Sequence, residues 1–116
     1  MRLLIFVVGI LASTISISAD LPQTVGVGST SCSSWNKIKS KPEYEFYAVV
    51  WLQGFISGVN TSEYLSKGRL RNIHGKEYSY YANALSSFCG SPKNAHRSLS
   101  SVAMDILLAS EEIAPQ

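Results

Sequence analysis

Residues 44–60, YEFYAVVWLQGFISGVN, form the densest apolar stretch of the 116-residue chain outside its first twenty residues. Several of its aromatic residues and one glycine recur at steps of three and four, which is the repeat of one helix face. They are Tyr44, Tyr47, Trp51, Phe55 and Gly58. We therefore expect a central helix here, with the other helices packed around it.

The residues that flank this stretch predict where the helix begins and ends. Pro42 fits the first turn of a helix, where its missing N–H has no partner to lose. Glu43 and Glu45 follow, and acidic residues are favoured near a helix N-terminus. Asn60 tolerates the left-handed conformation that often ends a helix. The sequence therefore predicts a helix over residues 42–59 that Asn60 terminates.

Two glycines inside the predicted helix indicate close packing. Gly54 and Gly58 are four residues apart, so they lie on one side of the helix. Each glycine costs a helix roughly 1 kcal/mol relative to alanine, and close approach of another helix would offset that cost. We expect the helix-packing residues to be Trp35, Trp51, Gly54, Gly58 and Asn60.

Three further segments have helical signals. A short helix is expected around Trp35, a second helix over 77–89, and a last helix over 92–110. The last helix has a clear apolar stripe, formed by Leu99, Val102, Ala103, Ile106 and Leu107. No alternating strand pattern of useful length is present. The predicted fold class is therefore all-α, a small bundle of three to four helices.

The domain organisation follows from the ends of the chain. Residues 1–19 resemble a signal peptide, with Arg2 at the start and an apolar run after it. A retained membrane anchor is the less favoured alternative, because the run is shorter than the roughly 20 residues that span a bilayer. We expect a flexible leader at 20–31, one helical domain at 32–110 and a tail at 111–116. The expected location is the periplasm or the medium, without stable membrane insertion.

The chain has two cysteines, Cys32 and Cys89. In an exported protein two cysteines most simply pair with each other. This predicts one disulfide, which would help a small domain that buries only a modest fraction of its surface. The alternative is that the cysteines serve as reactive or metal-binding thiols.

The polar segment 61–76 is the most basic part of the chain. It separates the central helix from the next one and contains Gly68 and Gly75, which interrupt any long period. One interpretation is a solvated connecting loop. The other is a contact surface for an acidic protein partner, with candidate residues Lys67, Arg69, Arg71, His74 and Lys76.

Composition and spacing disfavour other functions. A formal charge of +2 creates no strong field that would attract nucleic acid. Cys89 and His96 would make a nucleophile and base only if Cys89 were a free thiol. His74, His96 and Asp105 lack the spacing of metal ligands. We therefore expect no enzymatic activity, no metal and no cofactor.

Three segments carry a resemblance to a known family. They are Cys32-Ser33-Ser34-Trp35, the segment 51–60 with the pattern W-x-x-G-F-x-x-G-x-N, and Phe88-Cys89 with Pro92 after it. Over residues 30–110 the chain resembles small exported proteobacterial proteins grouped with the Tai/Rap-type immunity proteins of type VI secretion. It resembles HdeA-like periplasmic acid-stress chaperones more loosely.

The resemblance implies an all-helical periplasmic protein with Cys32 bonded to Cys89 and a non-enzymatic role in protein binding. In immunity proteins, that role is to bind a peptidoglycan-cleaving amidase effector and block its active site. The expected partner is therefore a secreted cell-wall hydrolase, and a homodimer is a further expected assembly. An acid-activated chaperone is the alternative function.

Overall fold

The computed structural model describes residues 24–113. The predicted signal peptide, the first part of the predicted leader and the last three residues of the tail lie outside this range. The described chain forms four α-helices, two 3₁₀ turns and two strands of two residues each, which confirms the predicted all-α bundle. The elements are η1 (Gly26–Ser29), α1 (Cys32–Ile38), α2 (Pro42–Lys67), β1 (Leu70–Arg71), α3 (Tyr78–Gly90), η2 (Pro92–Asn94), α4 (Leu99–Leu108) and β2 (Glu112–Ile113).

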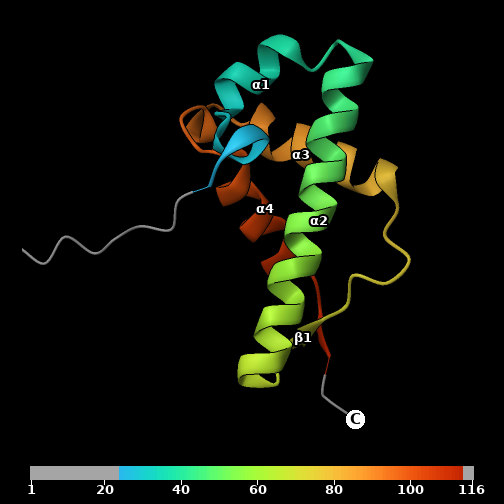
Figure 1. Ribbon diagram of the computed structural model, residues 1–116. Coiled ribbons are helices and arrows are strands. Elements are labelled where there is room, and N and C mark those ends of the chain that lie inside the picture. Colours follow the sequence, from blue (N-terminus) through green and yellow to red (C-terminus); the bar gives the residue numbers. More distant parts are fainter. Residues whose placement is uncertain (1–23, 114–116) are drawn as a thin grey trace, which may run out of the picture.

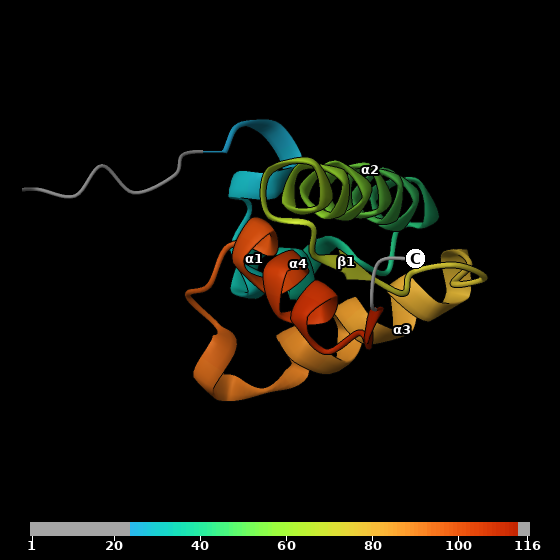
Figure 2. The same cartoon turned by 90° about the horizontal axis from the view of Figure 1, so that it is seen from below.

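Helix α2 is the longest element and runs along one side of the bundle, with α1, α3 and α4 on the other side (Figures 1 and 2). Pro42 stands in its first turn, as predicted. The predicted end is wrong, because the helix passes through Asn60 and stops at Gly68. Gly68 has a φ of 67° and donates its N–H to the carbonyl of Tyr64. Residues 61–67 contain no glycine or proline, so the helix continues until the first residue that readily adopts the left-handed conformation.

The face of α2 that meets the bundle differs from the predicted face. Its buried residues are Ala48, Val49, Leu52, Ile56 and Asn60. Tyr44 and Tyr47, which we expected on the buried face, are 42% and 58% exposed. The aliphatic face of α2 packs on α3 and α4, whereas the aromatic face lies toward η1 and solvent. The spacing alone could not choose between them, because both faces repeat at three and four residues.

The close approach of another helix predicted at Gly54 and Gly58 does not occur among the described residues. Both are exposed, and a Cβ built on either one meets no atom within 4 Å among the described residues. No helix of the described chain uses the space beside them. The glycine that does need its small size is Gly28 in η1, where a Cβ would lie 2.1 Å from the Trp51 ring. Trp51 therefore packs against the backbone of η1 and not against another helix.

The disulfide between Cys32 and Cys89 is present and joins the start of α1 to the end of α3. Both cysteines are buried, and Trp35 beside them is 2% exposed. The side-chain amide of Asn36 donates a hydrogen bond to the Cys89 carbonyl at 2.9 Å. The short first helix is thus fixed to α3 by a covalent bond, a buried ring and a hydrogen bond.

Helix α4 confirms the predicted stripe, because Leu99, Val102, Ala103, Ile106 and Leu107 are all buried. The helix begins at Leu99 and not at Pro92. Pro92 opens the 3₁₀ turn η2, and Ser98 caps α4 by accepting a hydrogen bond from the Ser101 N–H. The intervening backbone is paired elsewhere: the Arg97 carbonyl accepts from Cys32 N–H at 2.8 Å. This pairing holds residues 95–98 against the start of α1 and prevents a continuous helix.

Both predicted flexible ends are partly folded. Residues 24–31 of the predicted leader contain η1, which contacts α2 and α4 and buries Gly28. In the predicted tail, Glu112 and Ile113 of β2 pair antiparallel with Arg71 and Leu70 of β1. The expectations of a flexible leader and a frayed tail are therefore wrong for these residues.

Candidate protein-binding surfaces

An apolar groove of about 300 Å³ opens where η1, α1 and the first half of α2 meet. We call it the aromatic groove. It is lined by Val27, Thr30, Trp35, Ile38, Tyr44, Tyr47, Ala48 and Leu99. Trp35, Ala48 and Leu99 are buried and belong to the core, so core side chains form the floor of the groove.

The rim of the aromatic groove is aromatic and basic. Tyr44 and Tyr47 come from successive turns of α2 and are partly exposed. The ammonium group of Lys41 lies 5.5 Å from the centre of the Tyr44 ring, a cation–π contact. The groove therefore combines an apolar interior with positive charge at one edge.

Only part of this groove is predictable from the sequence. Trp35 was predicted as a packing residue and Tyr44 as part of a helix face, and the structure brings both into one concave surface. Val27 and Thr30 were missed because they fall in a glycine- and serine-rich segment without a period. No pattern in that segment signals that it folds back over α2.

The predicted basic surface is divided in the structure. Two of its residues are held within the chain. Nη1 of Arg71 donates to the carbonyl oxygens of Leu108 and Ser110 at 3.0 and 2.8 Å, where α4 ends. Nζ of Lys76 donates to Ser110 Oγ at 2.9 Å. Cations near the end of a helix satisfy carbonyls that lack intrahelical partners, so Arg71 and Lys76 stabilise the C-terminal segment.

The other three residues of that set remain at the surface. Lys67 forms an ion pair with Glu63 at 3.3 Å, one turn earlier on α2. Arg69 and His74 are exposed in the segment between α2 and α3. The five residues thus do not form one continuous patch with a shared role.

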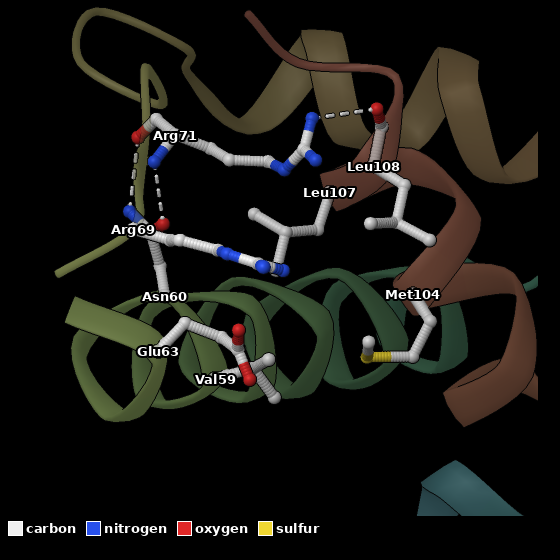
Figure 3. A pocket seen from close by; sticks show the side chains of 8 residues that line it. All are labelled: Val59, Asn60, Glu63, Arg69, Arg71, Met104, Leu107 and Leu108. Atoms are coloured by element: carbon white, nitrogen blue, oxygen red, sulfur yellow. Dashed lines mark hydrogen bonds between the residues drawn. The ribbon is translucent and has the colours of Figure 1, made fainter. Parts of the chain in front are cut away.

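A smaller pocket of about 210 Å³ lies beside Arg71, between the end of α2, β1 and α4. Figure 3 shows the side chains of Arg69 and Arg71 extending toward α4 over an apolar lining. That lining includes Val59, Met104, Leu107 and Leu108. Asn60 forms two hydrogen bonds with the Arg71 backbone, donating to its carbonyl at 3.0 Å and accepting its N–H at 2.9 Å. Asn60 therefore acts as a strand partner for β1, not as a helix terminator.

Replacing Asn60 by alanine is expected to lower the free energy of unfolding by about 2 kcal/mol. The reason is that the partly buried N–H and carbonyl of Arg71 would lose both hydrogen bonds to the Asn60 amide. Urea denaturation of the variant and of Asn83→Ala, an exposed position on α3, measures the effect. Equal stability of the two variants would show that the amide does not anchor β1.

Two tyrosines of α3 have raised pKa values. Burial raises the pKa of Tyr78 above 10.0, and the hydrogen bond to Glu45 adds to the effect. The Tyr78 hydroxyl donates to Glu45 Oε1 at 3.1 Å, which links α3 to the first turns of α2. Burial also raises the pKa of Tyr81.

We expect the free energy of unfolding to fall as the pH rises above about 10. A raised pKa means that the folded chain keeps these two protons after the unfolded chain has released them. The tyrosine contribution is therefore complete below pH 10 and is lost as the pH passes the folded pKa values. Denaturation at successive pH values measures the slope, which should be smaller in a Tyr78→Phe, Tyr81→Phe double variant. An unchanged slope in that variant would contradict the assignment.

Cys89 and Asp105, two of the residues considered for other chemistry, have partners within the chain. The sulfur of Cys89 is bonded to Cys32, so it is not a free nucleophile. Asp105 forms an ion pair with Arg97, and this interaction raises the pKa of Arg97. Among residues 24–113 no three His, Cys, Asp or Glu side chains are grouped as a metal site would require. In the same range no helix combines the length and apolarity needed to cross a membrane.

Comparison with known proteins adds nothing to this description. No family model, curated protein or solved structure matches the chain. The class that the fold defines is a small, disulfide-linked, all-helical protein with an aromatic groove. The resemblance to Tai/Rap-type immunity proteins stays a prediction from the sequence.

Proposed function

We propose that this protein works without catalysis, by binding another protein in the aromatic groove. The observation that carries the proposal is a partly exposed aromatic rim above a buried apolar floor. Tyrosine and tryptophan are enriched at interfaces, and a few anchored side chains usually dominate the binding energy. A groove of about 300 Å³ has room for one large apolar side chain of a partner.

The charge beside the groove specifies the partner further. The ammonium group of Lys41 lies over the ring of Tyr44 at the groove rim. An acidic residue next to the apolar anchor of the partner would meet this ammonium group. We therefore propose a partner segment that combines a large apolar residue with a neighbouring carboxylate. Within the predicted periplasmic location, a secreted peptidoglycan amidase blocked by this contact is the form that the sequence resemblance favours.

The test compares two exposed tyrosines on the same helix. Tyr44 lines the groove, and Tyr64 is exposed to a similar degree near the other end of α2. The partner is first sought by affinity capture from periplasm and among hydrolases encoded beside the gene. Its affinity is then measured by calorimetric titration with the native chain, Tyr44→Ser and Tyr64→Ser.

We expect Tyr44→Ser to weaken binding by about tenfold or more, the effect of losing an interface anchor. Tyr64→Ser should bind like the native chain. If the partner is an amidase, the native chain and Tyr64→Ser should inhibit peptidoglycan hydrolysis, and Tyr44→Ser should inhibit less. Equal affinity of the two variants would contradict the groove as the binding site.

The alternative function, an acid-activated chaperone, has one supporting observation. The chain exposes several large apolar side chains on α2, among them Phe46, Val50 and Leu65. At pH near 2–3 the carboxylates protonate and the net positive charge grows, which loosens a compact fold. Light scattering of an aggregating client at that pH tests this function. Full client aggregation beside an intact native fold would eliminate it.

A further inference from the structure

The pocket drawn in Figure 3 lies where the end of α2, β1 and α4 meet, and it has a volume of about 210 Å³. We call it the arginine pocket. It shares no lining residue with the aromatic groove, so the two sites can be tested separately. Its lining combines two arginines with four apolar residues, which are Arg69 and Arg71 and Val59, Met104, Leu107 and Leu108.

The charges around the arginine pocket leave one cation without a counter-charge. Glu63, the acidic residue of the lining, forms an ion pair with Lys67 at 3.3 Å. Nη2 of Arg71 lies 3.9 Å from a carboxylate oxygen of Glu112. Arg69 is exposed and forms no ion pair with any residue in the range 24–113. The pocket therefore offers a guanidinium group whose charge no carboxylate of the described chain neutralises.

The second arginine adds to the attraction for an anion. Figure 3 shows the side chains of Arg69 and Arg71 extending in the same direction, toward α4 and over the apolar lining. The C-terminal end of α4 would by itself repel an anion, but Nη1 of Arg71 already donates to the carbonyls of Leu108 and Ser110 there. Guanidinium groups bind carboxylates through parallel N–H···O hydrogen bonds. A carboxylate at the mouth of the pocket would therefore meet two positive charges with suitable donors.

The interior of the pocket favours an aliphatic chain behind that carboxylate. Leu107 is 3% exposed and belongs to the core, and Val59 and Met104 are half-buried. A volume of about 210 Å³ is roughly that of seven water molecules, and it is smaller than the sites of drug-sized ligands. A chain of about six carbon atoms fits this space. Burying it would remove apolar surface of both ligand and pocket from water.

We propose that the arginine pocket binds a small monocarboxylate with a short aliphatic chain. The carboxylate binds Arg69 and Arg71, and the chain packs among Val59, Met104 and Leu107. An inorganic anion would leave the apolar lining uncovered, and an amine would meet like charge. Because Arg69 is exposed to solvent, its ion pair with the ligand is weak, and we expect a dissociation constant on the order of 1 mM.

Met104 provides a direct readout of binding. The chain has two methionines, Met1 and Met104, so labelling the methionine methyl groups gives at most two such signals in an NMR spectrum. Only Met104 lines the pocket. Hexanoate added to the full oxidised chain should shift the Met104 signal saturably. Hexanol, which keeps the chain without the charge, and acetate, which keeps the charge without the chain, should each bind at least about tenfold more weakly.

Two variants that each remove one exposed positive charge complete the test. Arg69→Gln should weaken hexanoate binding by at least about tenfold and leave the binding of hexanol unchanged. Lys37→Gln, at an exposed site on α1, is the matched control and should bind hexanoate like the native chain. Tyr44→Ser, which alters the aromatic groove, should also bind it normally.

Three results would overturn the proposal. The first is the absence of a saturable Met104 shift up to about 20 mM hexanoate. The second is equal affinity of the native chain for hexanoate and hexanol, which would show that the arginines do not recognise the carboxylate. The third is equal affinity of Arg69→Gln and Lys37→Gln for hexanoate.

Discussion

Replacing Cys32 and Cys89 together by serine is expected to lower the free energy of unfolding by about 4 kcal/mol. The disulfide closes a loop with a sequence separation of 57, and its loss restores that freedom to the unfolded chain. A domain of this size has a total stability of the same order. Much of the reduced protein should therefore be unfolded at physiological temperature.

Thermal and urea denaturation of the double variant, with circular dichroism as the readout, measures this loss. Reduction of the native protein should reproduce it, because both treatments open the same loop. Reduction of the double variant is the control and should have no further effect, since the structure contains no other disulfide in residues 24–113. A double variant as stable as the native protein would show that hydrophobic packing alone holds α1 to α3.

Replacing Trp35 by alanine is expected to lower the free energy of unfolding by about 3–5 kcal/mol. The ring is 2% exposed, lies three residues after Cys32 in the sequence and forms part of the groove floor. Its removal leaves a large cavity between α1 and the core. Lys37→Ala, at an exposed site on the same helix, is the matched control and should change stability by less than about 0.5 kcal/mol.

Trp35→Phe separates the contribution of the ring volume to stability from the contribution of the Nε1–H donor. The Nε1–H of Trp35 is buried and has no acceptor among the described residues, so phenylalanine removes an unsatisfied donor along with part of the ring. We expect Trp35→Phe to cost much less than Trp35→Ala. Equal destabilisation by the two substitutions would indicate that the donor has a partner and contributes to stability.

Features that depend on counts and on local repeats were predictable from the sequence. Two cysteines in a chain with an export-like start predicted the pairing of Cys32 with Cys89. The apolar stripe of α4 was correct at each position because that helix has one strongly apolar side. The predicted helix over residues 77–89 corresponds to α3 at Tyr78–Gly90, so the bounds differ by one residue at each end.

The predictions fail where local propensity permits more than one structure and tertiary contacts decide which one forms. Asn60 suits a helix end by propensity, but in the structure its amide pairs with the backbone of Arg71. Helix α2 has an aromatic and an aliphatic side, and only the position of α3 and α4 decides which side is buried. The groove depends on η1 folding over Trp51, and that contact requires Gly28, whose role has no periodic signature.

Amide hydrogen exchange with and without the bound partner tests the central claim most directly, because it shows which surface the partner covers. We predict slower exchange at the aromatic groove, in η1, in α1 and in the first half of α2, with little change over residues 69–76. Slower exchange confined to residues 69–76, with the groove unaffected, would contradict the account.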